Sequence, residues 1–253
     1  MLEDIGSILR SWPYDPQNSI RKVIDQDGSE KIQVRVDQGA FQGVLQMELD
    51  GRPDGVRPHN QPFALDHYKE MLRKQSEDPG GGVFQLDRKA CEEIFDESRR
   101  VYERYVFLLQ IQDYTRVIRD TERNIEVFRF VNQYAEREED RTNLERWWPY
   151  ILRIHGVARA MAAVQNEDYE TAFTVIRETR ERIEGLEEVD AEEFTAERKR
   201  SRQALDELEA EIREKRPLSQ SEQLKEALAE AIEEEEFERA AELRDKLREL
   251  DSQ

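Results

Sequence analysis

The chain has 253 residues, and its 58 acidic side chains outnumber its 39 basic ones, so that the formal net charge is -19 at pH 7. Its mean hydropathy of -0.91 favours many solvent-facing helices over one thick globule. Proteins that bind nucleic acid directly place Lys and Arg on the phosphates, so this charge argues against direct binding of DNA or RNA. No apolar run approaches the length of a membrane span, and no association with a membrane is expected.

Cys91 is the only cysteine, which excludes an internal disulfide and a C-x-x-C zinc site and suits a reducing compartment. The opening MLEDIGSILRSW carries acids where a secretory signal peptide carries positive charge. We therefore expect a soluble protein of the cytoplasm.

Residues 1–79 are expected to form a small module around an antiparallel sheet. The segments IRKVID, KIQVRVD and VLQMELD show partial alternation of apolar and polar side chains, which is typical of strands. DQDG, from Asp25 to Gly28, supplies a turn between the first two strands. Because a three-stranded sheet is marginal alone, PFALDHYKEMLRKQ could supply a helix to cover one face. EDPGGG, from Glu77 to Gly82, then predicts a flexible boundary.

The glycine-rich loop ELDGRPDGVRPH brings Glu48, Asp50, Asp54 and His59 close together in the sequence. One interpretation is a metal or phosphate site, but the spacing matches neither an EF-hand nor a P-loop. A turn that ends the third strand explains the same glycines. We therefore expect no metal and no cofactor.

Residues 84–189 show helical periodicity almost throughout. The segments DYTRVI, DYETAF and EFERAA share a template, in which an acid precedes an aromatic residue and an apolar or small pair follows three and four positions after the aromatic residue. In a helix, the aromatic residue and the pair lie on one face, just past the N-terminus. The pattern resembles tetratricopeptide-like helix pairs, although separations of 55 and 68 residues exclude a regular repeat array. A degenerate stack of helical hairpins and an ordinary helical bundle are both compatible with it.

One helix of this region is expected to run through NLERWWPYILRIHGVARAMAAV, with Thr142 and Glu145 in the spacing of a capping box. Pro149 is disfavoured inside a helix, so the helix either begins at Trp148 or is kinked. Residues 190–216 carry only a thin apolar stripe and predict a polar connecting helix with ion pairs on its surface.

Residues 217–253 predict two antiparallel helices. Ser219 and Glu222 have the spacing of a capping box, and the run EEEE marks the turn. On the second helix, apolar side chains cover about half the circumference, which is wider than the ~100° stripe that one partner helix needs. Arg244 falls inside this arc, where its guanidinium would need helix-end carbonyls or a carboxylate, such as that of Glu238 or one from a partner. Two such helices cannot bury a self-sufficient core, so the segment is predicted to be a docking element.

The segment AEAIEEEEFERAAELRDKL resembles the UVR motif, the short helical hairpin found near the C-terminus of UvrB and within UvrC. Similar motifs occur in ClpC-type chaperone ATPases and in the McsA adaptor. The resemblance covers about residues 217–251 and implies association with a partner protein, or self-association, through the hairpin. The residues that carry the resemblance, and that we expect to bind the partner, are Leu228, Ala231, Phe237, Glu238, Ala240, Ala241, Leu243, Arg244, Asp245 and Leu247.

The chain has no G-x-x-x-x-G-K-[ST] loop, no recognisable nuclease constellation and no cysteine pairs like those of McsA. Its remainder, including LQMELDGRPDG, resembles bacterial proteins distinguished only by this motif. The resemblance therefore implies protein association and not catalysis.

Together these features predict an α+β protein that is mostly α. It has a small N-terminal antiparallel sheet module, a helical-hairpin middle region and a C-terminal two-helix UVR hairpin. We expect a non-catalytic intracellular adaptor or scaffold whose partner resembles UvrB, UvrC or a Clp-type ATPase. One alternative is an accessory protein of nucleotide-excision repair that acts through UvrB- or UvrC-like partners. Another is an enzyme built on the N-terminal module around Asp50 and Asp54.

Overall fold

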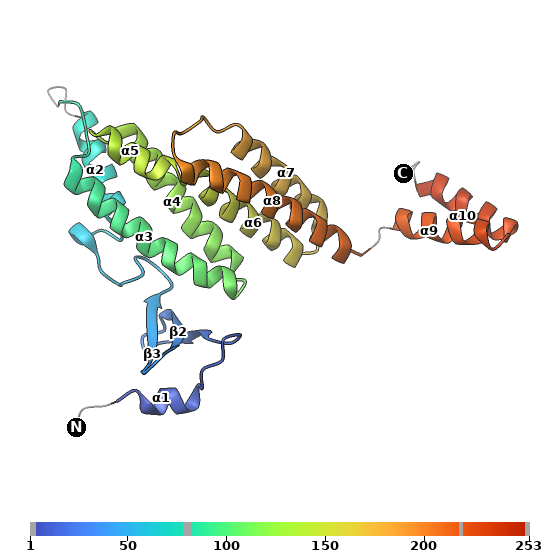
Figure 1. Ribbon diagram of the computed structural model, residues 1–253, viewed down its shortest axis with the longest axis horizontal. Helices are drawn as coiled ribbons and strands as arrows, with labels where there is room; N and C mark the ends of the chain where they lie inside the picture. The colour runs from blue at the N-terminus through green and yellow to red at the C-terminus, as the bar shows by residue number, and fades with distance from the viewer. Residues whose placement is uncertain (1–3, 78–81, 218–219, 251–253) are drawn as a thin grey trace. The chain divides into compact units, whose positions relative to one another are not determined.

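The computed structural model describes residues 4–77, 82–217 and 220–250, and the chain divides into two compact units, Met1–Leu208 and Glu209–Gln253. Each unit is considered by itself (Figure 1). The predicted fold class is confirmed: the chain is mostly helical, a small antiparallel sheet lies near the N-terminus, and a helix pair lies in the C-terminal region. Residues 78–81, within the predicted flexible boundary, lie outside the described residues.

The sheet consists of the three strands that the alternation predicts. They pair antiparallel in the order β1-β2-β3, with bounds Ile20–Ile24, Glu30–Gln38 and Phe41–Glu48. Gly28 in the first turn and Gly39 in the second have φ values of +84° and +60°, in the left-handed region that glycine adopts without steric cost. Ile32 and Val34 of β2 are buried and lie on the same face of the sheet.

Two long helices form a hairpin beside the sheet. The helices in this part of the chain are α1 (Gly6–Ser11), the short 3-10 helix η1 (Pro58–Asn60), α2 (Ala64–Glu77), α3 (Arg88–Gln110) and α4 (Tyr114–Tyr134). The sequence suggested α2 as the cover of the sheet, but α2 packs mainly against α3 and η1. Ion pairs from Lys22 to Asp113 and from Glu30 to Arg116 link the sheet to the α3–α4 turn instead.

A buried ion pair fixes the end of β3 to this hairpin. Arg104 of α3 and Asp120 of α4 have side chains only 1% exposed, and they form two hydrogen bonds of 2.6 and 2.8 Å. The remaining guanidinium nitrogen, Nη1 of Arg104, donates to the carbonyls of Glu48 at 3.0 Å and Gly51 at 2.7 Å. The charge on each side chain is therefore compensated within the protein, where Arg119 is a second partner of Asp120 at 2.9 Å.

Four further helices extend the helical region: α5 (Glu138–Glu145), α6 (Trp148–Gln165), α7 (Tyr169–Glu184) and α8 (Glu192–Lys215). The predicted capping box is wrong, because Thr142 and Glu145 lie inside α5, where the Thr142 hydroxyl donates to the Glu138 carbonyl at 3.0 Å. The alternative start is confirmed: α6 begins at Trp148, with Pro149 in its first turn, where a missing N–H costs nothing.

The α6–α7 pair is packed very closely. A Cβ atom at Gly156 of α6 would lie 2.2 Å from the hydroxyl oxygen of Thr179 on α7, so only glycine fits there. On the other side of α6, Nδ1 of the buried His155 lies 3.0 Å from the Thr121 hydroxyl oxygen of α4. The Thr121 hydroxyl already donates to the Val117 carbonyl, so Nδ1–H of a neutral His155 is the donor.

Helix α8 lies along α6 and α7 (Figure 1). Its thin apolar stripe is buried at Phe194 and Leu205. Ser201 of α8 donates to the Pro149 carbonyl at 3.1 Å, and Glu197 accepts from Arg153 at 3.2 Å. As far as Leu208, therefore, the polar helix predicted over 190–216 is part of the first compact unit.

The echo between DYTRVI and DYETAF has a structural cause. In the α3–α4 turn, Gln112 has φ +58°, its N–H donates to Leu109, and the next N–H, of Asp113, donates to Leu108. The α6–α7 turn repeats this arrangement, with Glu167 at φ +60° and the N–H of Asp168 bonded to Ala163. This is the Schellman arrangement that ends a helix. The acid that follows the turn then caps the next helix, with its side chain accepting from the backbone N–H three residues later.

No helix in the described part of the chain combines the length and the apolar character that a membrane crossing requires.

Candidate partner-binding surface

The second compact unit contains a hairpin of two helices, α9 (Gln220–Glu233) and α10 (Phe237–Leu250), which pack against each other. Its turn is the third copy of the Schellman arrangement: Glu235 has φ +59°, its N–H donates to Ile232, and the Glu236 N–H donates to Ala231 at 2.8 Å. The segment EFERAA therefore follows the same kind of turn as its two upstream echoes. Ser219 of the predicted capping box lies outside the described residues, as does the side chain of Glu222.

Small side chains form the centre of this hairpin. Ala231 of α9 and Ala240 and Leu247 of α10 are buried, whereas Leu228, Ala241 and Leu243 are half-buried. Alanines at the contact let the two backbones approach closely, but they remove little apolar surface from water. Such a core is too small to stabilise the hairpin strongly.

The largest apolar side chain of the hairpin does not contribute to this core. Phe237, the first residue of α10, is 70% exposed. The equivalent residue after the first turn, Tyr114, is only 6% exposed, and Tyr169 after the second is half-buried. On the α9 side of the turn, Ile232 is 55% exposed. Two large apolar side chains, one on each side of the turn, therefore face solvent at the same end of the hairpin.

The predicted place of Arg244 is wrong. We expected it on the inward arc, paired with an acid such as Glu238 or one from a partner, but its side chain is 59% exposed and its Nε lies 3.9 Å from the carboxylate of Asp245. The residues that face α9 are Ala240 and Leu247, which lie seven positions apart. Arg244, four positions beyond Ala240, is rotated by about 40° around the helix axis from Ala240. Because the single helix α9 covers only one side of α10, a long polar side chain at that angle extends past α9 into water.

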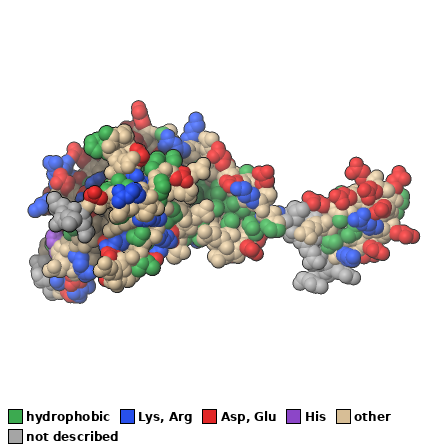
Figure 2. Space-filling view, turned by 90° about the horizontal axis from the view of Figure 1, so that it is seen from below, with side chains coloured by type: hydrophobic (Ala, Val, Ile, Leu, Met, Phe, Trp, Pro, Cys, Tyr) green, Lys and Arg blue, Asp and Glu red, His purple; other side chains and the backbone are tan. Residues whose placement is uncertain are grey.

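Arg244 and Phe237 are also seven positions apart, so they occupy the same exposed flank of α10. We call these two residues of α10, together with Ile232 near the end of α9, the exposed flank. Acidic side chains surround it, since Glu233, Glu234, Glu235, Glu236 and Glu238 are all exposed. Figure 2 shows acidic and hydrophobic side chains interspersed on the visible face of this unit.

The ten residues predicted to bind a partner therefore have two different roles in the free hairpin. Six form or border its core, and four are exposed: Phe237, Glu238, Arg244 and Asp245. Ile232 is exposed as well, although it is not among the ten residues that the sequence predicted. Its position at the C-terminal end of α9, immediately before the turn, was the available signal.

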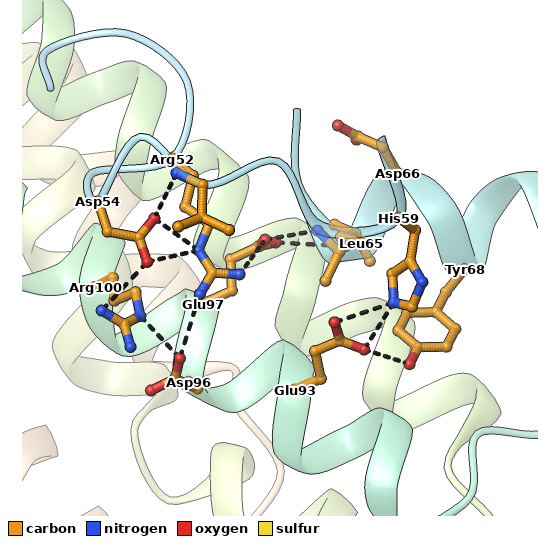
Figure 3. Close-up of polar contacts among 12 residues, drawn as sticks. Arg52, Asp54, His59, Leu65, Asp66, Tyr68, Glu93, Asp96, Glu97 and Arg100 are labelled. Atoms are coloured by element: carbon orange, nitrogen blue, oxygen red, sulfur yellow. Dashed lines mark hydrogen bonds and ion pairs between the residues drawn. The ribbon is translucent and has the colours of Figure 1, made fainter. Parts of the chain in front are cut away.

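A second polar cluster lies in the first unit, around the N-terminus of α2 (Figure 3). Glu97 of α3 is fully buried and accepts from the backbone N–H groups of Ala64 at 2.6 Å and Leu65 at 3.3 Å. Arg123 supplies the counter-charge at 3.0 Å. Because Glu97 satisfies donors at a helix N-terminus that would otherwise be buried without partners, its role here is to fix α2 on α3.

The histidines of the loop and of α2 surround another acid. His59 Nε2 lies 3.0 and 3.1 Å from the two oxygens of Glu93, and the Tyr68 hydroxyl donates to the same carboxylate at 2.7 Å (Figure 3). The rings of His59 and His67 stack with their centroids 3.9 Å apart. Burial raises the pKa of Glu93, but the hydrogen bonds from Tyr68 and His59 outweigh it and leave this pKa below its usual value. Burial lowers the pKa of His67, and the neighbouring His59 lowers it further.

The acids of the glycine-rich loop do not form a common site. Asp50 pairs with Arg119, Asp54 with Arg52 and Arg100, and Glu48 with Lys31, whereas His59 faces Glu93. Within the described ranges, no three His, Cys, Asp or Glu side chains come together as metal ligands. Cys91 is buried, and this burial raises the pKa of its thiol to about 12, which disfavours the reactive thiolate.

Comparison with known proteins bears on the hairpin alone. No curated protein and no solved structure matches the chain. One family model does match, and it spans residues 220–253, the segment that forms α9 and α10. The match confirms the resemblance noted in the sequence and associates the segment with protein interaction. The C-terminal hairpin is thus a UVR motif, described as the UvrB/uvrC motif.

Proposed function

We propose that the protein is a non-catalytic adaptor that docks onto a partner protein through the exposed flank of its UVR hairpin. The observation that carries the proposal is the exposure of Phe237. The same turn occurs three times in the described part of the chain, and the aromatic residue that follows it is buried in the first copy, half-buried in the second and 70% exposed in the third. An aromatic side chain at a protein surface is a frequent anchor of protein interfaces.

The charge around the flank indicates the chemistry of the partner. The exposed glutamates from Glu233 to Glu236 would repel an acidic surface and attract a basic one. We therefore expect a partner with an apolar pocket for Phe237 and Ile232, bordered by Lys or Arg side chains.

The contacts of the first unit support a structural role for its ionisable residues. Glu97 and the Arg104–Asp120 pair connect elements that lie far apart in the sequence, and the acids of the glycine-rich loop are each held by a basic side chain. A general acid or base, by contrast, needs surroundings that shift its pKa to the value that its reaction requires.

Affinity capture from the source cell, with the full chain and with a chain ending at Lys215 as baits, tests the proposal. We expect partners that the full chain retains and the shortened chain loses. Phe237→Ala in the full chain should weaken capture at least tenfold while leaving the hairpin helical, because an exposed side chain contributes little to the fold. A matched control is Ile24→Ala, which removes an equally exposed apolar side chain from β1. Equal capture by the full chain, the shortened chain and Phe237→Ala would refute the docking role.

The name of the matched motif favours one alternative, an accessory role in nucleotide-excision repair. That role predicts co-purification with a UvrB- or UvrC-like protein and induction by DNA damage. Capture of a Clp-type ATPase without a repair protein would instead assign the adaptor to protein quality control.

A further inference from the structure

The sheet of the first unit has an edge at β3, in the N-terminal part of the sequence. Strand β3 is an edge strand, since β2 pairs with it on one side only and the order ends there. Phe41 is 79% exposed and Leu45 is 57% exposed on it. An inference from this edge is independent of the proposed adaptor function of the UVR hairpin.

The ladder shows which backbone groups of β3 point outwards. The Arg35 N–H donates to Ser19, on the β1 side, so the residue opposite Arg35 on β3, Val44, directs its own N–H and carbonyl away from β2. At the end of the strand, the N–H of Leu49 donates to the carbonyl of Glu30 on β2. Odd-numbered residues therefore direct their backbone groups towards β2 there as well. The outward groups therefore belong to the even-numbered residues Gln42, Val44, Gln46 and Glu48.

Glu48 is already satisfied within its own unit. Its N–H donates to Pro53 at 2.9 Å, and its carbonyl accepts from Arg104 at 3.0 Å. Among the residues that the structure describes, the outward backbone groups of Gln42, Val44 and Gln46 have no protein partner. The edge thus offers three donors and three acceptors, centred on Val44.

Natural edge strands are usually protected by lysine, proline or an inward-pointing charge. Strand β1 follows this rule, with Arg21 and Lys22 in IRKVI. Strand β3 does not: FQGVLQME has no basic residue and no proline, and its one charge is at the satisfied end, Glu48. The unprotected edge is therefore β3.

We propose that β3 pairs antiparallel with β3 of a second copy of this chain, about a twofold axis through Val44. In this register Val44 lies opposite Val44, and Gln42 lies opposite Gln46 of the other copy. All six outward groups of each strand are then hydrogen-bonded. A register displaced by one or two residues leaves some of them unpaired.

The side chains favour a second copy over an unrelated strand. Phe41 of one copy lies beside Met47 of the other, and Leu45 lies beside Gly43, so exposed apolar groups cover each other. No charged residue of β3 lies opposite a like charge, because Glu48 is beyond the paired segment. Two copies with a net charge of -19 each repel one another, but charges farther apart than about 8 Å are screened at physiological ionic strength. Only like charges close to the paired strands would therefore oppose the dimer. An interface of one short strand pair is small, so we expect a weak, concentration-dependent dimer.

Cysteine crosslinking tests the register in the full chain. Val44→Cys places two thiols on the axis with Cα atoms about 5.5 Å apart, within disulfide range. Under mild oxidation we expect a covalent dimer on a non-reducing gel, with buried Cys91 as the internal control. Gln42→Cys is the matched control, because its two copies would be about 14 Å apart. Combining it with Gln46→Cys should restore the crosslink.

Analytical ultracentrifugation over a concentration series gives an independent readout. Val44→Pro removes an outward N–H without removing a bond to β2, and should lower the dimer fraction at least tenfold. The chain ending at Lys215 should dimerise like the full chain. The proposal is overturned if the wild-type chain stays monomeric, if Val44→Cys and Gln42→Cys crosslink equally, or if the shortened chain loses the dimer. The last result would assign self-association to the hairpin.

Discussion

At the scale of single residues, buried charges hold the first unit together. Arg104 and Glu97 each satisfy backbone groups of a distant element as well as an ionised partner. Removal of Arg104 or Glu97 therefore takes away the most buried partner of an ionised side chain and also leaves buried backbone groups unpaired.

Arg104→Ala should lower the free energy of unfolding by about 3 kcal/mol, because it leaves the buried Asp120 with only the partly exposed Arg119 as counter-charge and leaves the carbonyls of Glu48 and Gly51 without their donor. Arg99→Ala on the same helix should cost less than about 1 kcal/mol, since the pairs of Arg99 with Asp96 and Glu103 are solvent-exposed. Urea denaturation of both variants measures the difference. Equal losses would mean that the buried pair contributes no more to the free energy of unfolding than the exposed pairs do.

His155 predicts an acid sensitivity. Burial, reinforced by Arg159 and Arg182, lowers the pKa of His155 from 6.5 to about 4. The unfolded chain therefore binds a proton between pH 6.5 and 4 that the folded chain does not, so stability falls as the pH drops through this range. At pH 5 the loss should be about 2 kcal/mol relative to pH 7. His155→Gln should reduce this pH dependence in denaturation curves, and an unchanged slope would contradict the assignment.

At the scale of elements, the three helix–helix turns and the close α6–α7 contact determine how the hairpins form. The turns put Gln112, Glu167 and Glu235 in the left-handed region, where a residue with a Cβ is disfavoured by about 1–2 kcal/mol. The α6–α7 contact depends on the missing side chain of Gly156.

Gly156→Ala should destabilise the first unit by about 1–3 kcal/mol, because the added methyl group overlaps Thr179. Thr179→Ala removes two of the three clashing atoms, so the double variant should recover part of the loss. Thermal unfolding of the two single variants and the double variant forms the required cycle. If the losses simply add, the two residues are not in contact.

Glu235→Gly should stabilise the UVR hairpin by about 1 kcal/mol, since glycine adopts the left-handed conformation without steric cost. Glu234→Gly, one residue earlier, does not occupy that region and should not stabilise. Hydrogen exchange of the α10 amides in the full chain reports on the hairpin alone. Slower exchange in both variants, or in neither, would argue against a strained turn.

At the scale of the whole molecule, the chain combines two compact units of different character. The first has an extensive core that spans helices and sheet, whereas the second has a core of a few small side chains and keeps Phe237 in solvent. Its stability should therefore depend more on a partner than that of the first unit.

A chain that ends at Lys215 should keep the unfolding midpoint of the first unit within about 1 °C. This follows from the division of the chain near Leu208, which leaves the core of that unit intact. Circular dichroism melts of the full and shortened chains provide the comparison, with the Phe237→Ala variant as a control that changes no chain length. A large drop on shortening would show that the hairpin stabilises the first unit.

The sequence by itself determined the local elements and the motif. Alternation located all three strands, helical spacing located the long helices, and the repeated acid–aromatic template correctly marked the starts of α4, α7 and α10, because caps and turns depend on neighbouring residues. The UVR hairpin was identified from about thirty residues for the same reason.

Only the tertiary structure decided which surfaces are free. The apolar arc of α10 predicted a buried Arg244, but the position of α9 determines which side is buried, and the buried residues are Ala240 and Leu247 instead. Likewise, no local signal shows that α2 packs on α3 or that the outward edge of β3 is uncovered. Periodicity gives the faces of an element, whereas burial depends on partners that are distant in the sequence.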